Sequence, residues 1–91
     1  MLYAVSYDIA DDHRRLKISR ALLDFGTRVQ ESVFECVLEG EMLADLIQRL
    51  ESTLKSDQDS VRVYPICGNC KEAIRILGQG TVTEDPQVYI I

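Results

Sequence analysis

The sequence predicts an α+β domain in which two helices pack on one face of an antiparallel sheet. Short runs of alternating apolar residues, which are typical of strands, come before, between and after two segments with the apolar spacing of helices. The order is strand, helix, one or two strands, helix, strand. A length of 91 residues suits one domain with one hydrophobic core.

The first strand is expected at residues 2–7, where the side chains alternate between two faces. Tyr3, Val5 and Tyr7 fall on one of these faces. Asp8 stands at the C-terminal edge of the strand, so it lies next to the turn that leads into the first helix.

A helix is expected from Asp11 or Asp12 to about Phe25, because aspartate is a common N-cap and Gly26 is the residue type expected just past a helix end. Its apolar residues form a wide arc, which indicates contact with more than one surface. One group of side chains falls together and two leucines fall nearly opposite: Ile18, Ala21, Leu22 and Phe25 against Leu16 and Leu23.

The middle of the chain carries a second strand region and a second helix. Residues 27–38 alternate but lack a strong turn dipeptide, so they form either one long kinked strand or two short strands broken near Glu31 and Ser32. The helix after them is predicted by aliphatic side chains that recur every three or four residues: Leu43, Leu46, Ile47, Leu50 and Leu54.

The last third of the chain is predicted to be mostly strand. Residues 60–67 form one strand, in which Pro65 indicates an edge position or a bulge. Residues 73–77 alternate again. After a loop at residues 78–86, the apolar residues 88–91 are expected to form a final strand.

This order of elements corresponds to a ferredoxin-like βαββαβ sandwich with additional C-terminal strand material, and residues 1–91 are expected to form a single domain. The fold by itself names no function. No segment approaches the length of a membrane-spanning helix and the N-terminus lacks the basic leader of a signal peptide, so a cytoplasmic protein with no membrane partner is expected. So small a core also favours oligomerisation.

The net charge of −5 disfavours nucleic-acid binding, but the charges are placed unevenly. Residues 13–30 carry one acid, Asp24, and five basic side chains: Arg14, Arg15, Lys17, Arg20 and Arg28. A local basic patch can attract phosphate on an acidic protein, because salt screens surface fields beyond about 10 Å. The alternative is a solvated helix face on which Arg20 pairs with Asp24.

The three cysteines, Cys36, Cys67 and Cys70, are expected to be reduced thiols. Cys67 and Cys70 form a lone CxxC. A structural zinc site needs four ligands, and a thioredoxin-like pair usually opens a helix after a strand near the N-terminus. Two half-buried thiols at a turn are therefore the favoured interpretation.

The end of the first strand and the start of the first helix carry the residues best suited to chemistry. Asp8 is followed within a turn by Asp11, Asp12 and the basic cluster, which places metal-binding and phosphate-binding side chains close together. No residue stands out as a general base, and His13 at the helix start is expected to be solvated. The alternative is structural, with Asp8 ending a strand and the next two aspartates capping a helix.

An ordered set of motifs carries a family resemblance. It comprises Tyr7-Asp8-Ile9, Arg14-Arg15-x-Lys17, Gly26-x-Arg28-Val29-Gln30-x-Ser32-Val33-Phe34, the leucine-rich second helix and Val63-x-Pro65-Ile66. In this order, over about the first 66 residues, the chain resembles the CRISPR-associated protein two family, the small subunit of the spacer-acquisition machinery.

The resemblance implies a metal-dependent endonuclease that cleaves single-stranded RNA or double-stranded DNA in spacer acquisition for antiviral defence. It implies a homodimer in which Asp8 of each chain faces a shared Mg²⁺ or Mn²⁺ ion. The residues implied in catalysis are Asp8, Tyr7 and Phe34, with Asp8 as the metal ligand, and those implied in nucleic-acid binding are Arg14, Arg15, Lys17, Arg28 and Ser32.

The resemblance also implies an alternative of a different class. In it the chain is a non-catalytic, DNA-binding subunit that holds the CRISPR adaptation integrase, CRISPR-associated protein one, on new spacer DNA. The sequence leaves both functions open, because an aspartate that binds a catalytic metal cannot be distinguished by residue type from one that maintains the dimer geometry. In either case residues 78–91 are expected to pack on the partner protomer.

Overall fold

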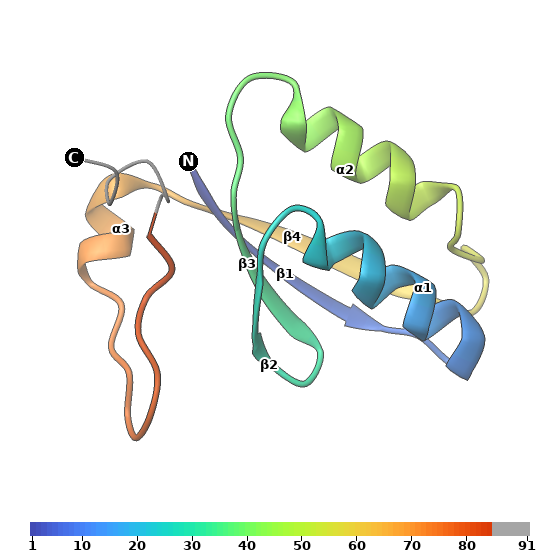
Figure 1. Cartoon of the computed structure of the whole chain (residues 1–91), viewed down its shortest axis with the longest axis horizontal. Coiled ribbons are helices and arrows are strands. Elements are labelled where there is room, and N and C mark those ends of the chain that lie inside the picture. Colours follow the sequence, from blue (N-terminus) through green and yellow to red (C-terminus); the bar gives the residue numbers. More distant parts are fainter. Residues whose placement is uncertain (85–91) are drawn as a thin grey trace.

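The structure is a computed structural model and describes residues 1–84 (Figure 1). Its elements follow in the order β1 (Leu2–Asp8), α1 (Asp12–Leu23), β2 (Thr27–Gln30), β3 (Val33–Val37), α2 (Met42–Glu51), β4 (Ser60–Ile66) and α3 (Gly68–Glu72). The four strands form one antiparallel sheet in the order β2-β3-β1-β4. This order of strands and helices confirms the predicted ferredoxin-like arrangement.

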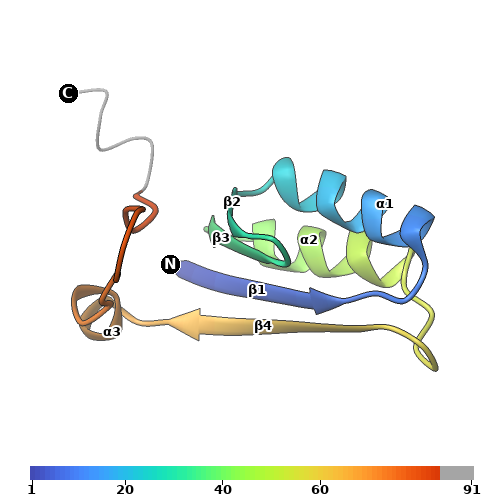
Figure 2. The same cartoon turned by 90° about the horizontal axis from the view of Figure 1, so that it is seen from below.

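Both long helices cover one face of the sheet, as Figure 2 shows. Val5 of β1 lies opposite Phe34 of β3 and Val63 of β4, so the covered face is continuous across three strands. Residues that alternate with these, such as Ala4 and Ser6, face the other side. Within residues 1–84 no helix covers the centre of that second face, which we call the open face. Thr83 contacts this face at Glu35, which is in register with Ala4.

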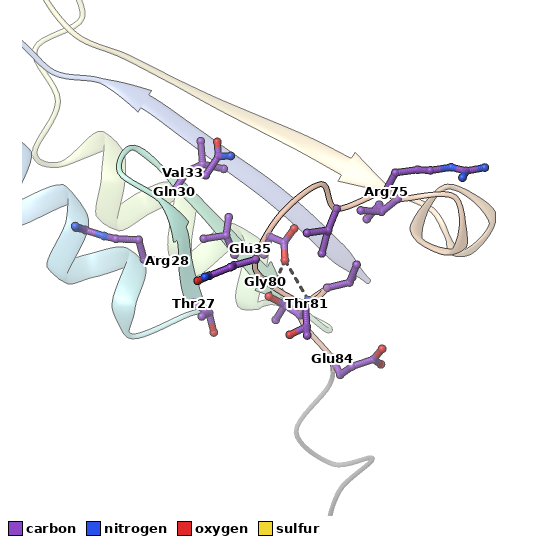
Figure 3. Close-up of a pocket in the computed structure, with 15 residues that line it drawn as sticks. Thr27, Arg28, Gln30, Val33, Glu35, Arg75, Gly80, Thr81 and Glu84 are labelled. Carbon is purple, nitrogen blue, oxygen red and sulfur yellow. Dashed lines mark hydrogen bonds between the residues drawn. The ribbon is translucent and has the colours of Figure 1, made fainter.

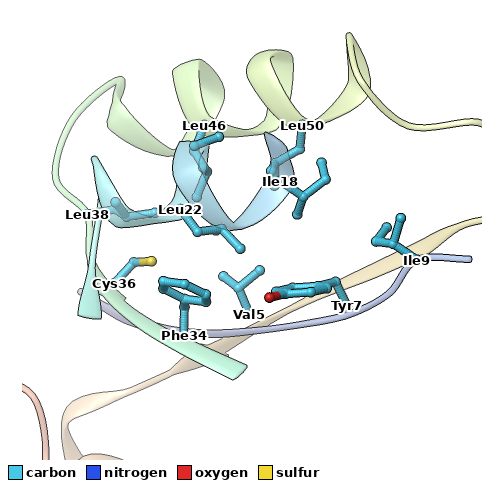
Figure 4. Close-up of a cluster of buried hydrophobic side chains, with 11 residues drawn as sticks. Val5, Tyr7, Ile9, Ile18, Leu22, Phe34, Cys36, Leu38, Leu46 and Leu50 are labelled. Atoms are coloured by element: carbon cyan, nitrogen blue, oxygen red, sulfur yellow. The ribbon is translucent and has the colours of Figure 1, made fainter. Parts of the chain in front are cut away.

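The hydrophobic core lies between this covered face and the two helices (Figure 4). The largest fully buried side chains come from β1, β3, α1 and α2: Phe34, Ile18, Leu22, Leu46, Val5 and Cys36. Each large aliphatic or aromatic side chain removed from water contributes about 1.5–3 kcal/mol. Leu16 and Leu23, which the helical arc placed nearly opposite the core group, are exposed.

Helix α1 begins and ends close to the predicted residues. Asp11 is the N-cap, and its carboxylate accepts a hydrogen bond of 2.9 Å from the backbone N–H of Arg14. The helix ends at Leu23, and Asp24 is its C-cap. The side chain of Asp24 accepts from Arg49 of α2 at 2.8 Å, so the expected pair between Arg20 and Asp24 is replaced by a contact between the two helices.

Gly26 was expected as a helix-ending glycine, but the structure gives it a different role. Its backbone has no left-handed conformation. A Cβ atom at this position would overlap the backbone oxygen of Glu35 and the sulfur of Cys36. Glycine is therefore required at this position for the close approach of the chain to β3.

Residues 27–38 form two strands, which resolves the alternative left open by the sequence. β2 and β3 pair antiparallel with a register shift between Arg28 and Gln30, and the turn between them lies at Glu31 and Ser32. Tyr7 anchors this turn, because its backbone N–H donates to the Ser32 carbonyl oxygen at 3.1 Å and its hydroxyl donates to the Glu31 carbonyl oxygen at 3.3 Å.

The region after β4 differs from the prediction. Pro65 does lie on an edge strand, since β4 pairs with β1 alone among the described strands. The strand predicted at residues 73–77 is wrong: the short helix α3 directly follows β4, and residues 74–77 have no regular secondary structure. A short alternating run needs a free strand edge in register, and α3 turns the chain away from β4 before that run begins. The final strand expected at residues 88–91 lies outside the described residues.

Within residues 1–84 no helix has the length and apolar character needed to cross a membrane.

Candidate functional site

A cleft of about 360 Å³ opens where β1 ends, between α1 and the turn that joins β2 to β3. The residues that line it are Tyr7, Asp12, Arg15, Leu16, Ser19, Arg28, Glu31 and Ser32. The cleft therefore brings together four of the residues named from the sequence, namely Tyr7, Arg15, Arg28 and Ser32. These residues come from three separate segments and meet because Tyr7 anchors the β2–β3 turn.

Arg28 supplies one cationic group of the cleft, and a buried aromatic pair supports it. The guanidinium carbon lies 5.3 Å from the centre of the Phe34 ring, a cation–π arrangement. Phe34 is fully buried and packs against Tyr7 with ring centres 6.3 Å apart. Phe34 does not line the cleft itself and contacts it through Arg28 and Tyr7. None of the ion pairs formed within residues 1–84 involves Arg28.

Arg15 supplies the second cationic group. One of its guanidinium nitrogens, Nη1, donates to the backbone oxygen of Ile9 at 3.1 Å, which ties it to the loop after β1. The other, Nη2, forms an ion pair with Asp12 one turn earlier in α1. The pair is exposed to solvent, so an incoming phosphate can compete with Asp12 for this guanidinium.

Arg14 lies outside the cleft and is bound to Asp59 instead. Its Nε donates to Asp59 Oδ2 at 2.7 Å and its Nη2 donates to Asp59 Oδ1 at 3.2 Å. The same carboxylate accepts from the backbone N–H groups of Lys55 and Ala10 at 3.0 and 3.3 Å. The Arg14 guanidinium, followed by these backbone groups, lowers the pKa of Asp59 to about 2. Lys17 is exposed on α1 and does not line the cleft either.

Asp8 is exposed at the end of β1, one residue after Tyr7 and in register with Ser60 of β4. Because neighbouring side chains of a strand point to opposite faces, Asp8 belongs to the open face and Tyr7 to the covered face. Asp8 therefore stands at the same end of the sheet as the cleft but does not line it.

The donor chemistry around Asp8 can be compared with the needs of a divalent ion. Mg²⁺ prefers oxygen ligands, keeps several waters and is often held by one or two carboxylates. An exposed aspartate suits that preference. No cluster of three or more His, Cys, Asp or Glu side chains able to hold a metal occurs within residues 1–84. Within the described residues, Asp8 is therefore not part of a cluster of three or more such ligands formed by one chain.

Several cleft residues were not recognised as site residues in the sequence. The sequence indicates Asp12 only as a helix cap or a metal-binding acid, and Leu16 only as an outlying leucine of the helical arc. Ser19 is buried, and its hydroxyl donates to the backbone oxygen of Leu16 at 3.0 Å. The sequence does indicate that Glu31 lies in a turn, since it is one of the two positions at which residues 27–38 could divide into two strands. His13 is exposed at the helix start, as expected.

A larger cavity, of about 690 Å³, lies between the β2–β3 hairpin and residues 74–84 (Figure 3). Its far wall is fixed to the sheet by Glu35, whose Oε1 accepts from the backbone N–H of Thr83 at 3.1 Å and from the Thr83 hydroxyl at 2.7 Å. Arg28 borders both cavities, and in Figure 3 its side chain extends away from Glu35. Of the catalytic and nucleic-acid-binding residues named from the sequence, Arg28 alone lines this cavity.

The cysteines correct one further expectation. Cys36 is buried, and burial raises the pKa of its thiol to about 11. Cys67 and Cys70 were expected to be half-buried at a turn, but both are exposed and lie at the start of α3. The CxxC thus opens a helix that directly follows a strand.

Two similar proteins match nearly the full length of this chain. A protein of Chloroflexus aurantiacus named CRISPR-associated endoribonuclease Cas2 1 is 46% identical, with 100% of both chains covered. A protein of Thermus thermophilus named CRISPR-associated endonuclease Cas2 2 is 43% identical, with 99% of this chain and 96% of the relative covered.

Solved structures show the same fold. Streptococcus pyogenes Cas2 superposes with a TM-score of 0.75 at 30% identity, over 86% of this chain and 100% of that one. A chain of a partial Cas6-RT-Cas1–Cas2 complex superposes with a TM-score of 0.65 at 26% identity, over 84% of this chain and 89% of that one. Residues 1–74 match the family model described as CRISPR associated protein Cas2. The chain therefore belongs to the CRISPR-associated protein Cas2 family.

Proposed function

We propose that this chain is a CRISPR-associated endonuclease that hydrolyses phosphodiester bonds of nucleic acid and acts as a homodimer. The observation that carries the proposal is the cleft at the end of β1, in which Arg15 and Arg28 converge beside the strand end that bears Asp8. The names of two similar proteins, an endoribonuclease Cas2 and an endonuclease Cas2, also support the proposal. The substrate is therefore RNA or DNA.

In this proposal the two arginines bind backbone phosphates. Guanidinium groups match phosphate oxygens with paired N–H donors, and Arg28 is held in place by the Phe34 ring. Ser32 adds a hydroxyl donor at the rim. Tyr7 is a positioning residue, because its hydroxyl is directed to the Glu31 carbonyl oxygen and fixes the turn that carries Ser32. Lys17, exposed on α1, extends the basic surface along the helix.

Asp8 from each of two chains would hold one Mg²⁺ or Mn²⁺ ion. Such an ion, when bound, polarises the phosphoryl oxygen and lowers the pKa of a coordinated water. The carboxylates contribute the negative charge and the oxygen ligands that a hard cation requires. Among the described residues no imidazole lines the cleft, and its two carboxylates are Asp12, which is paired with Arg15, and Glu31.

The open face of the sheet supports a homodimer. Register pairs place Ala4 and Ser6 of β1 on the same face as Val33 and Tyr64 of the neighbouring strands. Tyr64 remains 47% exposed there, and so small a core benefits from further apolar burial. Asp8 lies on this face as well, so packing two open faces about a two-fold axis near the C-terminal ends of the two β1 strands would bring two Asp8 carboxylates toward each other. In the same proposal the C-terminal tail, residues 78–91, packs on the partner, while Thr83 within it contacts Glu35 of its own chain.

A second function of a different class is favoured by one observation. The cleft contains two acidic side chains, Asp12 and Glu31, beside its two arginines, which weakens unaided binding of a polyanion. A subunit that holds nucleic acid together with a partner is less affected by this acidity. One structural neighbour is a chain of a complex that contains both Cas1 and Cas2. In this alternative the partner is therefore an integrase that contains Cas1.

Replacing Asp8 with asparagine tests the nuclease. Asp8→Asn keeps the size of the side chain and removes the charge that attracts a cation, so Mg²⁺-dependent cleavage of RNA and DNA should fall by orders of magnitude while sedimentation still shows a dimer. Asp45→Asn, an exposed acid on α2, is the matched control and should cleave as the unmodified protein does. Equal cleavage by all three proteins would refute the nuclease and leave the structural subunit.

A further inference from the structure

The cysteine pair at the start of α3 has no role in the proposed nuclease. Cys67 is the N-cap residue, with φ −68° and ψ 168°, and Cys70 is the third residue of the helix. The Cys67 carbonyl oxygen accepts from the backbone N–H of Lys71 at 2.8 Å, and the Cys70 carbonyl oxygen accepts from Ala73 at 3.1 Å. These hydrogen bonds fix the turn that holds both exposed thiols.

The spacing of the two cysteines suits a disulfide between them. Residues three apart in a helical turn are neighbours on one face, with their Cα atoms roughly 5 Å apart from the radius and rise of the helix. A disulfide requires Cα atoms about 4.4–6.8 Å apart. The bond can therefore form without unwinding α3, and Gly68 between the two has free space around its Cα.

The two thiols differ from each other and from the third cysteine. Hydrogen bonds from the backbone N–H and the thiol of Cys70 lower the pKa of Cys67, whereas the same contact raises the pKa of Cys70. Cys67 thus carries the larger share of thiolate, the form that attacks disulfides. Cys36 is buried with a pKa of about 11, so its thiol is neither accessible to a small disulfide nor ionised at neutral pH.

We propose that Cys67 and Cys70 are a redox-active dithiol, which small disulfides such as oxidised glutathione convert into an intramolecular Cys67–Cys70 disulfide. The Cys67 thiolate attacks one sulfur of the small disulfide, which forms a mixed disulfide and releases one small thiolate. Cys70 then loses its proton and attacks the Cys67 sulfur, which closes the protein disulfide and releases the second small thiol. Two protein thiols are oxidised and one small disulfide is reduced to two thiols.

This dithiol is separate from the proposed nuclease site. Asp8 pairs with Ser60 at one end of β4, whereas α3 follows Ile66 at the other end, as Figure 1 shows. Oxidation at Cys67 and Cys70 therefore leaves the Asp8 end of the sheet unchanged. The two proposals can fail independently.

Thiol mapping in glutathione buffers of graded potential tests the dithiol. The full-length protein is equilibrated, quenched with an alkylating reagent under native conditions and analysed by intact mass and peptide mapping. Cys67 and Cys70 should be lost from the alkylated pool together, in a single two-electron transition, and appear as one linked peptide. Cys36 should stay reduced and be alkylated only after unfolding.

Two serine variants make the order of steps measurable, and both replace exposed side chains. Cys70→Ser should stop at a mixed disulfide of Cys67 with glutathione. Cys67→Ser should react at least roughly tenfold more slowly, because the remaining thiol has less thiolate. Three results would overturn the proposal: stable glutathione adducts on the unmodified protein, disulfides only between chains, or one zinc ion held by the thiols of two chains that blocks both alkylation and oxidation.

Discussion

Arg14 and Asp59 form a two-point ion pair that joins the start of α1 to the loop before β4, with Nε to Oδ2 at 2.7 Å and Nη2 to Oδ1 at 3.2 Å. Asp59 also accepts from the backbone of Ala10, two residues after Asp8. The pair thus fixes the segment between the strand end that carries Asp8 and the helix that carries Arg15. Of the two adjacent arginines of α1, Arg14 stabilises the fold and Arg15 lines the cleft.

Removing the Asp59 charge should destabilise the protein. Asp59→Asn keeps the shape of the side chain but loses the charge-assisted bonds to Arg14 and weakens those to the two backbone N–H groups, so the melting temperature should fall by several degrees. Asp45→Asn, whose residue is exposed on α2, should melt with the unmodified protein. Thermal unfolding followed by circular dichroism measures both, and an unchanged melting temperature for Asp59→Asn would show that the ion pair contributes nothing.

The stability that Asp59 provides should depend on pH in a defined window. The folded-state pKa is about 2 and the ordinary value is 3.8, so the contribution is complete above the ordinary value and is lost as the pH falls toward the folded-state value. The difference in melting temperature between the unmodified protein and Asp59→Asn should therefore shrink between pH 4 and pH 2. A difference that stays constant over this range would mean that Asp59 is not the titrating group.

Arg28 should contribute to nucleic-acid binding and Arg14 should not. Each phosphate contact adds about 0.7–0.9 to the slope of log affinity against log salt concentration. Arg28→Ala should lower the slope by about that amount for RNA and DNA of any sequence. Arg14→Gln, which removes the charge but keeps an N–H donor for Asp59, should leave it unchanged. Fluorescence anisotropy over a salt series gives the slopes, and the reverse pattern would place the phosphate on the Arg14 side of α1.

Gly26 should be intolerant of a single added methyl group. Gly26→Ala places a Cβ against the Glu35 backbone and the Cys36 sulfur, neither of which can move freely in the sheet. Overpacking of this kind costs about 1–3 kcal/mol of the free energy of unfolding. Gly68→Ala has no atom within 4 Å of the new Cβ and should be close to neutral. Urea unfolding of the two variants compares them directly, and equal stability would contradict the close approach.

The sequence predicted the two long helices and the first strands because their apolar periodicity coincides with the faces that the core buries. Ile18 and Leu22 on α1 and Leu46 and Leu50 on α2 are buried, as the spacing indicated. The prediction failed after β4, because α3 turns the chain away before residues 73–77 could pair with the free edge of β4. The periodic signal says which face of an element is apolar, and it does not say whether a partner strand is in reach.

The candidate site was predicted in part for a related reason. Arg15, Arg28 and Ser32 could be named from the sequence, but their convergence depends on the Tyr7 hydrogen bonds to the β2–β3 turn. Arg14 and Arg15 are adjacent in the sequence and have the same chemistry, yet one faces Asp59 and the other faces the cleft. Only the placement of Asp59, which is far away in the sequence, separates their roles.

The central proposal, one divalent ion shared by the Asp8 carboxylates of two chains, is tested most directly by the stoichiometry of Mn²⁺ binding to the purified dimer. Electron paramagnetic resonance of free Mn²⁺ during a titration should show one tight ion per two chains, absent in Asp8→Asn and retained in Asp45→Asn. One ion per chain, or the same tight binding in Asp8→Asn, would contradict the shared site.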